Sequence, residues 1–158
     1  MQSTLWSMVM AAVATLFLGA PSGAQERKDT GSYVAIPGAI ESYELADGST
    51  VDRSPNTGFL VADDASSPLH LAGMSCVGSS VVSTDRKSSS GGGSCLIVDR
   101  TGELIWAWWL GDQDGGTWGF LDGTGKFAGV QGNGIWTSDA VFPGGKLINK
   151  WTMTWRMK

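Results

Sequence analysis

The stretch from Gly115 to Trp136, GGTWGFLDGTGKFAGVQGNGIW, constrains the fold more than any other part of the chain, because eight of its residues are glycine. A helix would lose about 1 kcal/mol at each interior glycine relative to alanine. Glycines between short apolar runs are instead typical of tight hairpins, bulges and coiled strands, where the backbone takes a positive φ or approaches another segment closely. The stretch therefore predicts an all-β architecture.

The first 24 residues have the layout of a secretory signal peptide. Leu5–Leu18 carries no charged residue, and Ser22-Gly23-Ala24 places small side chains at the −3 and −1 positions of a cleavage site before Gln25. The apolar run is too short for a comfortable membrane span. We therefore expect residues 1–24 to be removed and the mature protein to be periplasmic or secreted. Because no Lys or Arg precedes the run, an uncleaved anchor is the alternative.

Cleavage would leave a polar segment, residues 25–31, which is predicted to be a disordered leader, and a single domain over residues 32–158. The net charge is -4, and the lysines and arginines are scattered singly or in pairs. Nucleic acids and anionic membranes are bound by basic patches. We therefore expect no nucleic-acid partner, and no membrane partner once the signal peptide is removed.

Two cysteines, Cys76 and Cys95, are predicted to form one disulfide bond, because an exported chain meets oxidising conditions. The bond would close a loop that contains Ser88–Ser94, the most flexible part of the sequence. Two cysteines and the single histidine, His70, are too few for a closed metal site with four ligands. We expect no metal and no cofactor.

Short β-like segments follow one another along the rest of the chain, with turn signals spaced as in sandwiches and barrels. The predicted strands are Tyr33–Ile36, Ser42–Ala46, Gly58–Ala62, His70–Met74, Val77–Ser83, Cys95–Asp99, Glu103–Leu110, Thr117–Leu121, Lys126–Gln131, Ile135–Thr137 and Lys146–Arg156. No stretch keeps a helical period over a useful length. The hairpin signals between neighbours predict an antiparallel up-and-down β-barrel, since closure removes exposed strand edges.

Two of these segments show their faces clearly. Residues 149–157 alternate between apolar and polar side chains, as in a strand with one face exposed. In Glu103–Leu110 both faces are apolar, because Trp106 and Trp108 alternate with Ile105 and Trp109. A strand of that kind is expected to be covered on both sides.

Three segments of the chain suggest a family. Cys95–Glu103 (CLIVDRTGE), Gly115–Trp118 (GGTW) and Gly123–Gly134 (GTGKFAGVQGNG) resemble a broad group of exported bacterial proteins and the allene oxide cyclase and dirigent type of calycin barrel. The resemblance covers roughly Cys76 to Trp155. It implies about eight antiparallel strands around a central pocket, often in a homo-oligomer. No catalytic residue of either family can be carried over to this sequence.

Tryptophans are the first candidates for a site. Seven of the eight remain after removal of the signal peptide, and an indole offers a large rigid face with one N–H donor. We predict that Trp106, Trp108, Trp118 and Trp136 bind an apolar or aromatic ligand. The alternatives are that tryptophans only fill the centre of a small barrel, or that Trp109 points inward in place of its neighbours.

Polar candidates are weaker. His70 is the only side chain with an unperturbed pKa near neutrality, but a structural or surface role is favoured. Glu41, Glu44 and Glu103 lie near strands and could act as acids if they entered an aromatic pocket. Most aspartates fall in turns, where they accept hydrogen bonds from nearby backbone N–H groups.

The sequence thus favours an exported calycin-type barrel that binds a small apolar or aromatic molecule among its tryptophans. A cyclase or isomerase without a cofactor is the alternative that the resemblance allows, and it would act mainly by holding its substrate in shape. A structural envelope protein without a pocket is the third hypothesis.

Overall fold

The computed structural model describes residues 26–158, which form nine strands and one short 3-10 helix. The signal peptide predicted for residues 1–24 lies outside this range. The elements are β1 (Glu26–Pro37), β2 (Glu41–Glu44), β3 (Thr50–Ala62), β4 (Ala72–Val82), β5 (Ser89–Val98), β6 (Leu104–Asp112), β7 (Gly115–Gly123), η1 (Gly125–Phe127), β8 (Gln131–Val141) and β9 (Leu147–Arg156). Among these residues there is no helix with the length and apolarity of a membrane span.

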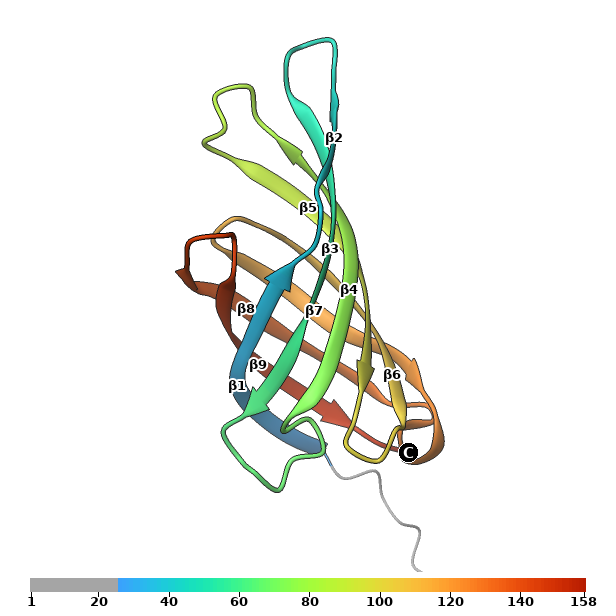
Figure 1. Ribbon diagram of the computed structural model, residues 1–158. Coiled ribbons are helices and arrows are strands. Elements are labelled where there is room, and N and C mark those ends of the chain that lie inside the picture. Colours follow the sequence, from blue (N-terminus) through green and yellow to red (C-terminus); the bar gives the residue numbers. More distant parts are fainter. Residues whose placement is uncertain (1–25) are drawn as a thin grey trace, which may run out of the picture.

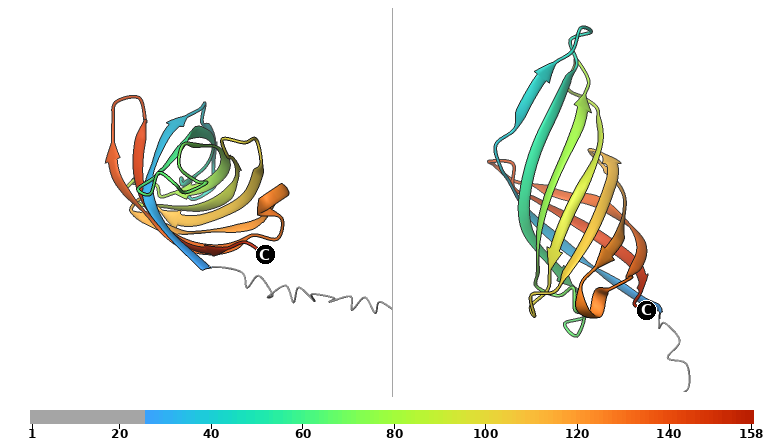
Figure 2. Two further views of the ribbon diagram at one scale, coloured as in Figure 1. Left: turned by 90° about the horizontal axis from the view of Figure 1, so that it is seen from below. Right: turned by 90° about the vertical axis from the view of Figure 1, so that its right-hand side faces the viewer.

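The sheet closes into a barrel (Figures 1 and 2). Its strands follow the order β1-β9-β8-β7-β6-β5-β4-β3, and β1 pairs with β3 to complete the circle. All pairings are antiparallel. β2 continues the path of β1 along β3 and lies on the part of the sheet that projects beyond the barrel (Figure 1). The predicted up-and-down barrel of about eight strands is confirmed, with one extra strand.

Several predicted segments differ from the observed strands. His70–Met74 and Val77–Ser83 belong to one region, in which a turn is followed by the single strand β4. Lys126–Gln131 is mostly the 3-10 helix η1 and a turn, not a strand. Both errors arise because apolar residues in a short segment can be buried by a turn as well as by a strand. The first turn buries Leu69, and the second buries Phe127 and Val130.

Two segments judged flexible from composition are strands. Residues 26–31, predicted as a disordered leader, form the start of β1 and pair with the end of β9. Ser89–Ser94, predicted as part of a flexible loop, pairs on both sides, with β4 and with β6. Sheet pairing on two sides overrides the low β propensity of serine and glycine.

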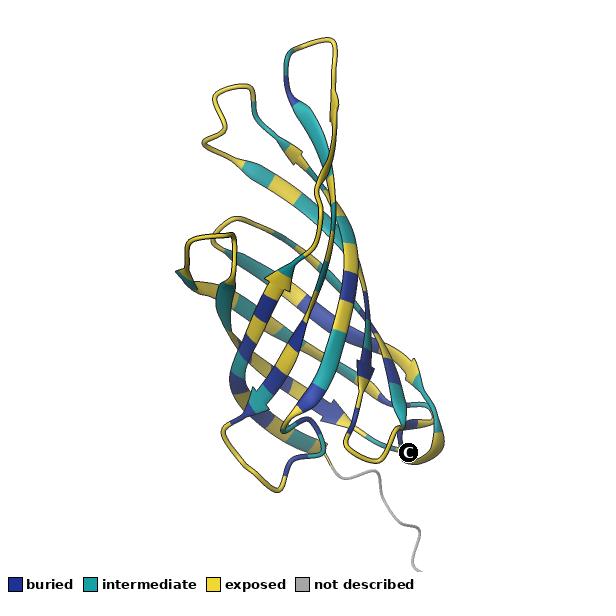
Figure 3. Ribbon diagram, in the orientation of Figure 1, coloured by how far each residue is buried: buried dark blue, intermediate teal, exposed yellow. Residues whose placement is uncertain are grey.

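Burial divides the barrel into a packed end and an open end. Figure 3 shows the buried residues gathered in the barrel and the projecting part of the sheet mostly exposed. The packed end is filled by Leu69, Phe127, Val130 and Trp155, none of which is accessible to more than a trace of solvent. Turns close this end, so any internal space lies toward the other one.

A buried carboxylate sits at the packed end. Asp29 accepts hydrogen bonds from Arg27 Nε (3.0 Å), Ser67 Oγ (2.9 Å) and the indole N–H of Trp155 (2.8 Å). These groups come from β1, the β3–β4 loop and β9. A buried charge is tolerated only when it is paired and hydrogen-bonded, so the Asp29 network links three distant segments.

The glycine-rich turn around η1 has specific backbone requirements. Gly125 (φ +52°) and Gly129 (φ +72°) take the left-handed conformation that L side chains rarely adopt. The Asp122 carboxylate accepts hydrogen bonds from the backbone N–H groups of Gly123 and Gly129, both at 2.8 Å. The glycines are therefore required by the turn itself.

Replacing Gly129 by alanine should lower the free energy of unfolding by about 1–2 kcal/mol, the cost of a Cβ in the left-handed region. Asparagine tolerates this region, so Gly129→Asn should cost less than half as much. Urea unfolding of the two variants measures the difference. Equal losses, or no loss in Gly129→Ala, would contradict the backbone role.

Candidate functional site

A cavity of about 290 Å³ occupies the barrel on the side away from the Asp29 network. All eight barrel strands contribute to its wall. The lining residues are Tyr33, Ala35, Asn56, Leu60, Met74, Cys76, Cys95, Trp108, Trp109, Asp112, Gln113, Trp118, Trp136, Ser138, Val141, Leu147, Asn149 and Trp151. The volume lies near the lower end of the range of about 300–1,000 Å³ for ligand pockets.

Four tryptophans form one part of this wall. Trp109 and Trp136 meet edge to face with ring centroids 6.5 Å apart, and Trp118 and Trp151 do the same at 5.6 Å. The two pairs are neighbours, because Trp136 and Trp151 are directly opposite across β8 and β9. We call Trp109, Trp118, Trp136 and Trp151 the tryptophan layer.

Glycines opposite the rings make room for this layer. A Cβ at Gly93 would come within 2.7 Å of Trp109 Nε1, and a Cβ at Gly31 within 2.8 Å of Trp151 Cζ2. A Cβ at Gly78 would collide with the Trp109 ring, and one at Gly134 would lie 2.9 Å from Trp118 Nε1. These four strand glycines therefore leave the space that the tryptophan rings occupy.

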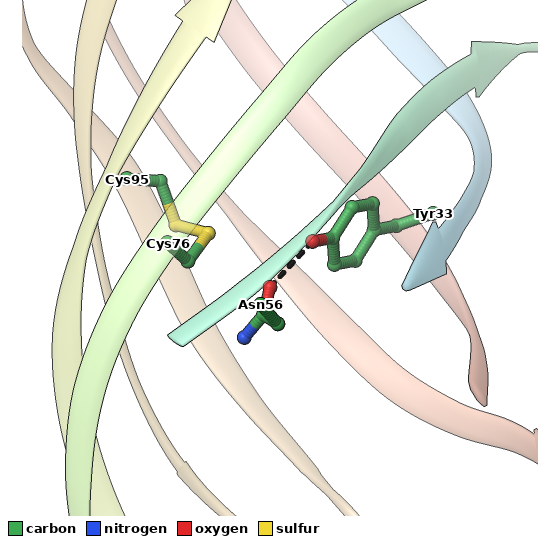
Figure 4. The surroundings of a disulfide bond; sticks show 4 residues. All are labelled: Tyr33, Asn56, Cys76 and Cys95. Atoms are coloured by element: carbon green, nitrogen blue, oxygen red, sulfur yellow. Dashed lines mark hydrogen bonds between the residues drawn. A yellow bond between two sulfur atoms is a disulfide. The ribbon is translucent and has the colours of Figure 1, made fainter. Parts of the chain in front are cut away.

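Uncharged polar side chains lie beside the tryptophan layer. The Tyr33 hydroxyl donates a hydrogen bond to Asn56 Oδ1 at 2.5 Å (Figure 4). Asn149 is paired with Tyr33 across β1 and β9 and with Ser138 across β8 and β9. We call Tyr33, Asn56, Ser138 and Asn149 the polar belt. It offers neutral donors and acceptors next to an aromatic surface.

The disulfide bond adjoins this belt. Cys76 and Cys95 are bonded, as predicted, and are direct partners across β4 and β5. Asn56 is paired with Cys76 across β3 and β4, so the sulfur atoms and the amide lie on the same inner surface (Figure 4). The bond is thus buried in the cavity wall and does not merely tie an external loop.

The cavity provides little for acid–base chemistry. Asp112, at the end of β6, is the one charged residue among those that line it. Burial raises the pKa of the Tyr33 phenol well above its usual value, so this hydroxyl stays neutral. The other lining residues are uncharged.

The predicted tryptophans are divided between the inside and the outside. Trp118 and Trp136 line the cavity. Trp106 lies on the outer surface with 42% of its area exposed, because Ile105 and Ala107 take the inward positions of β6. Trp108 is two residues further along β6, so the alternation places it on the same outward face as Trp106. Its ring lies against Gly119 of β7, and the residue also borders the cavity. A ligand role for all four stays a prediction.

The other polar candidates lie outside the cavity. Nδ1 of His70 lies 2.7 Å from the Ala62 carbonyl oxygen, to which it donates, in the β3–β4 loop. Glu41 and Glu44 are exposed on β2. Glu103 lies beside Lys126, which also binds the buried carboxylate of Asp99.

The Asp99 contacts are structural. Burial would raise the pKa of this carboxyl, but hydrogen bonds from Lys126 and Thr101 and from backbone N–H groups outweigh it and lower the pKa to about 2. This cluster holds the β5–β6 turn against η1. Groups of three or more potential metal ligands are not found in the described part of the chain.

The sequence analysis missed the polar belt. Asn149 could have been found, because it shares the alternation of Trp151 and Met153 on the inward face of β9. Tyr33 and Asn56 gave no such signal, since their meeting depends on the closure of β1 against β3.

Comparison with known proteins gives a likeness of fold. No family model and no curated protein sequence matches the chain. A solved pterocarpan synthase dirigent protein superposes with a TM-score of 0.53 at 12% identity, over 99% of this chain and 100% of that one. A second such protein gives 0.47 at 12% identity, covering 86% and 96%. Pyocyanin demethylase gives 0.45 at 15%, covering 80% and 98%. The chain thus has the barrel fold of dirigent proteins, as the resemblance implied.

Proposed function

We propose that this protein binds a small, uncharged, apolar or aromatic molecule in the cavity of its barrel. The observation that carries the proposal is the composition of the wall, in which the tryptophan layer adjoins the neutral polar belt. Aromatic side chains bind flat apolar ligands well, and a few polar groups fix their orientation. The small volume favours a ligand of two or three fused or linked rings.

Binding is proposed in preference to catalysis. A cyclase or isomerase of the allene oxide cyclase type could act by shape alone, but Asp112 is the one charged side chain that the lining offers to assist it. The disulfide bond fits an oxidising compartment, so we further propose a periplasmic or secreted location.

Two probes with one skeleton test the proposal. N-phenyl-1-naphthylamine is neutral, and 1-anilinonaphthalene-8-sulfonate adds one negative charge to nearly the same shape. Fluorescence titration should show saturable binding of the neutral probe. The sulfonate should bind at least 10-fold more weakly, because the cavity has no cation to pair with it.

Variants locate the binding in the cavity. Trp136→Ala removes a ring of the tryptophan layer and should weaken binding of the neutral probe by about 10-fold. Trp106→Ala, on the outer surface, serves as the control and should leave the affinity unchanged. The proposal is wrong if the neutral probe does not bind, or if Trp106→Ala weakens binding as much as Trp136→Ala does.

A further inference from the structure

Two indole N–H groups of the tryptophan layer have no hydrogen-bond partner. Nε1 of Trp136 and Nε1 of Trp151 are both buried, and residues 26–158 place no acceptor within hydrogen-bond distance of either atom. Trp151 as a whole is only 3% exposed. A buried donor without an acceptor destabilises a fold, and such groups are rare in natural proteins. Two of them in the wall of one cavity require an explanation.

Other buried indoles of the chain do have acceptors. The N–H of Trp118 donates to the Thr152 carbonyl oxygen at 3.1 Å, and the N–H of Trp155 donates to Asp29 Oδ2 at 2.8 Å. In both cases the acceptor belongs to a strand other than the one that carries the ring. The barrel thus satisfies these indoles from its own strands and leaves the two donors of Trp136 and Trp151 unpaired.

The wall behind the two rings consists of glycine backbone. A Cβ at Gly31 would lie 2.8 Å from Cζ2 of Trp151, and a Cβ at Gly111 would lie 2.6 Å from Cζ2 of Trp136. Gly31 is paired with β9 and β3, and Gly111 with β5 and β7. Because sheet pairing engages the backbone carbonyl groups, an acceptor for either indole has to come from the inside of the barrel.

The two unpaired donors are neighbours. Trp136 and Trp151 are direct partners across β8 and β9, and both line the cavity. Side chains that are opposite in an antiparallel pair begin from Cβ atoms about 4.5–5.5 Å apart. A carbonyl oxygen has two lone pairs and accepts two hydrogen bonds. One carbonyl group of a ligand is therefore enough to serve both indoles.

The polar belt adds a further donor. The Tyr33 hydroxyl occupies Oδ1 of Asn56, and the amide nitrogen of Asn56 points away from this contact (Figure 4). An amide nitrogen only donates. Asn56 lines the same cavity as the two indoles, so the wall presents N–H groups from both the aromatic and the polar side.

We propose that the ligand of this cavity carries a carbonyl group, as aromatic ketones and quinones do, and that the indole N–H groups of Trp136 and Trp151 turn toward its oxygen and bind it. This inference rests on the proposed function and adds the chemical class of the ligand. It also assigns a role to the two indoles beyond the apolar contact of their rings.

Other polar ligands fit the two donors less well. A carboxylate or a phenolate would bury a charge in a wall that has no lysine or arginine among its lining residues. An alcohol or a phenol also accepts, but its own O–H group then needs an acceptor, and Oδ1 of Asn56 is already taken by Tyr33. A carbonyl group brings acceptors alone.

Two ligands with one skeleton test the inference. Fluorenone and fluorene share three fused rings and differ only in a carbonyl group against a methylene group. Each is titrated against bound N-phenyl-1-naphthylamine. Fluorenone should bind at least about 10-fold more tightly than fluorene, because its oxygen satisfies two buried donors. A purely apolar pocket would give the opposite order, since the carbonyl group would lose its hydrogen bonds to water.

Phenylalanine variants locate the effect. Trp136→Phe and Trp151→Phe each keep an aromatic ring and remove the N–H, and each should reduce the preference for fluorenone over fluorene by about 5-fold. Trp118→Phe is the matched control, because its N–H is already bonded to Thr152. It should weaken both ligands alike and leave their ratio unchanged. Circular dichroism and the urea midpoint establish that each variant is folded.

The natural chain gives a measurement that needs no variant. With 15N-labelled tryptophan, two indole N–H resonances should move downfield on addition of fluorenone, as expected for new hydrogen bonds, and should not do so with fluorene. Equal affinities for the two ligands, or no downfield movement with bound fluorenone, would overturn the inference and leave the proposed function standing. If neither ligand displaces the probe and the probe itself does not bind, the proposed function fails, and the inference fails with it.

Discussion

Replacing Asp29 by alanine should lower the free energy of unfolding by about 3–5 kcal/mol, the usual cost of breaking a buried ion pair from one side. The side chain of Asp29 is only 1% exposed. Its loss leaves the N–H of Trp155 and the hydroxyl of Ser67 without their acceptor at the packed end of the barrel. Buried donors without a partner cost free energy in their own right. Urea unfolding at neutral pH gives the value.

Asp64→Ala is the matched control. Asp64 also binds Arg27, at 2.7 Å, but its side chain is 56% exposed. Exposed ion pairs contribute about 0–1 kcal/mol, so this variant should lose far less stability than Asp29→Ala. If the two variants unfold at the same urea concentration, the Asp29 network does not hold the packed end together.

The fold could be predicted from the sequence because its signals are local. The alternation of Trp151, Met153 and Trp155 on β9 identifies a strand with one buried face, and the Asp-Gly and Pro-Gly-Gly turns indicate hairpins. Closure follows from the number of short strands that would otherwise have free edges. Composition gave a wrong prediction for Ser89–Ser94. Its serines and glycines indicated a flexible loop, but pairing with β4 and β6 makes the segment a strand.

The site was harder to predict because the register of a strand decides which of its side chains point into the barrel. Trp108 and Trp109 are adjacent in the sequence, and a shift of one residue exchanges their places. Local pattern cannot choose between them when both faces of β6 are apolar. The structure distinguishes them through Gly78 and Gly93, which lie far away in the sequence and leave space for the Trp109 ring.

Removal of the disulfide bond should cost about 3 kcal/mol of stability, the value that the chain-entropy model gives for a loop of this length. Cys76 and Cys95 are 19 residues apart and are direct partners in the β4–β5 hairpin. The hairpin keeps its register without the bond, because both strands also pair with β3 and β6. The double variant Cys76→Ala/Cys95→Ala should therefore fold and still bind the neutral probe.

The natural chain unfolded in urea with a phosphine reductant is the control, since it loses the bond and keeps both sulfur atoms. Its loss of stability should match that of the double variant apart from the packing of the two sulfurs in the cavity wall. A thiol assay on denatured, unreduced protein should find no free sulfhydryl group. Two free thiols per chain, or a double variant as stable as the natural chain, would show that the bond does not form or does not stabilise the barrel.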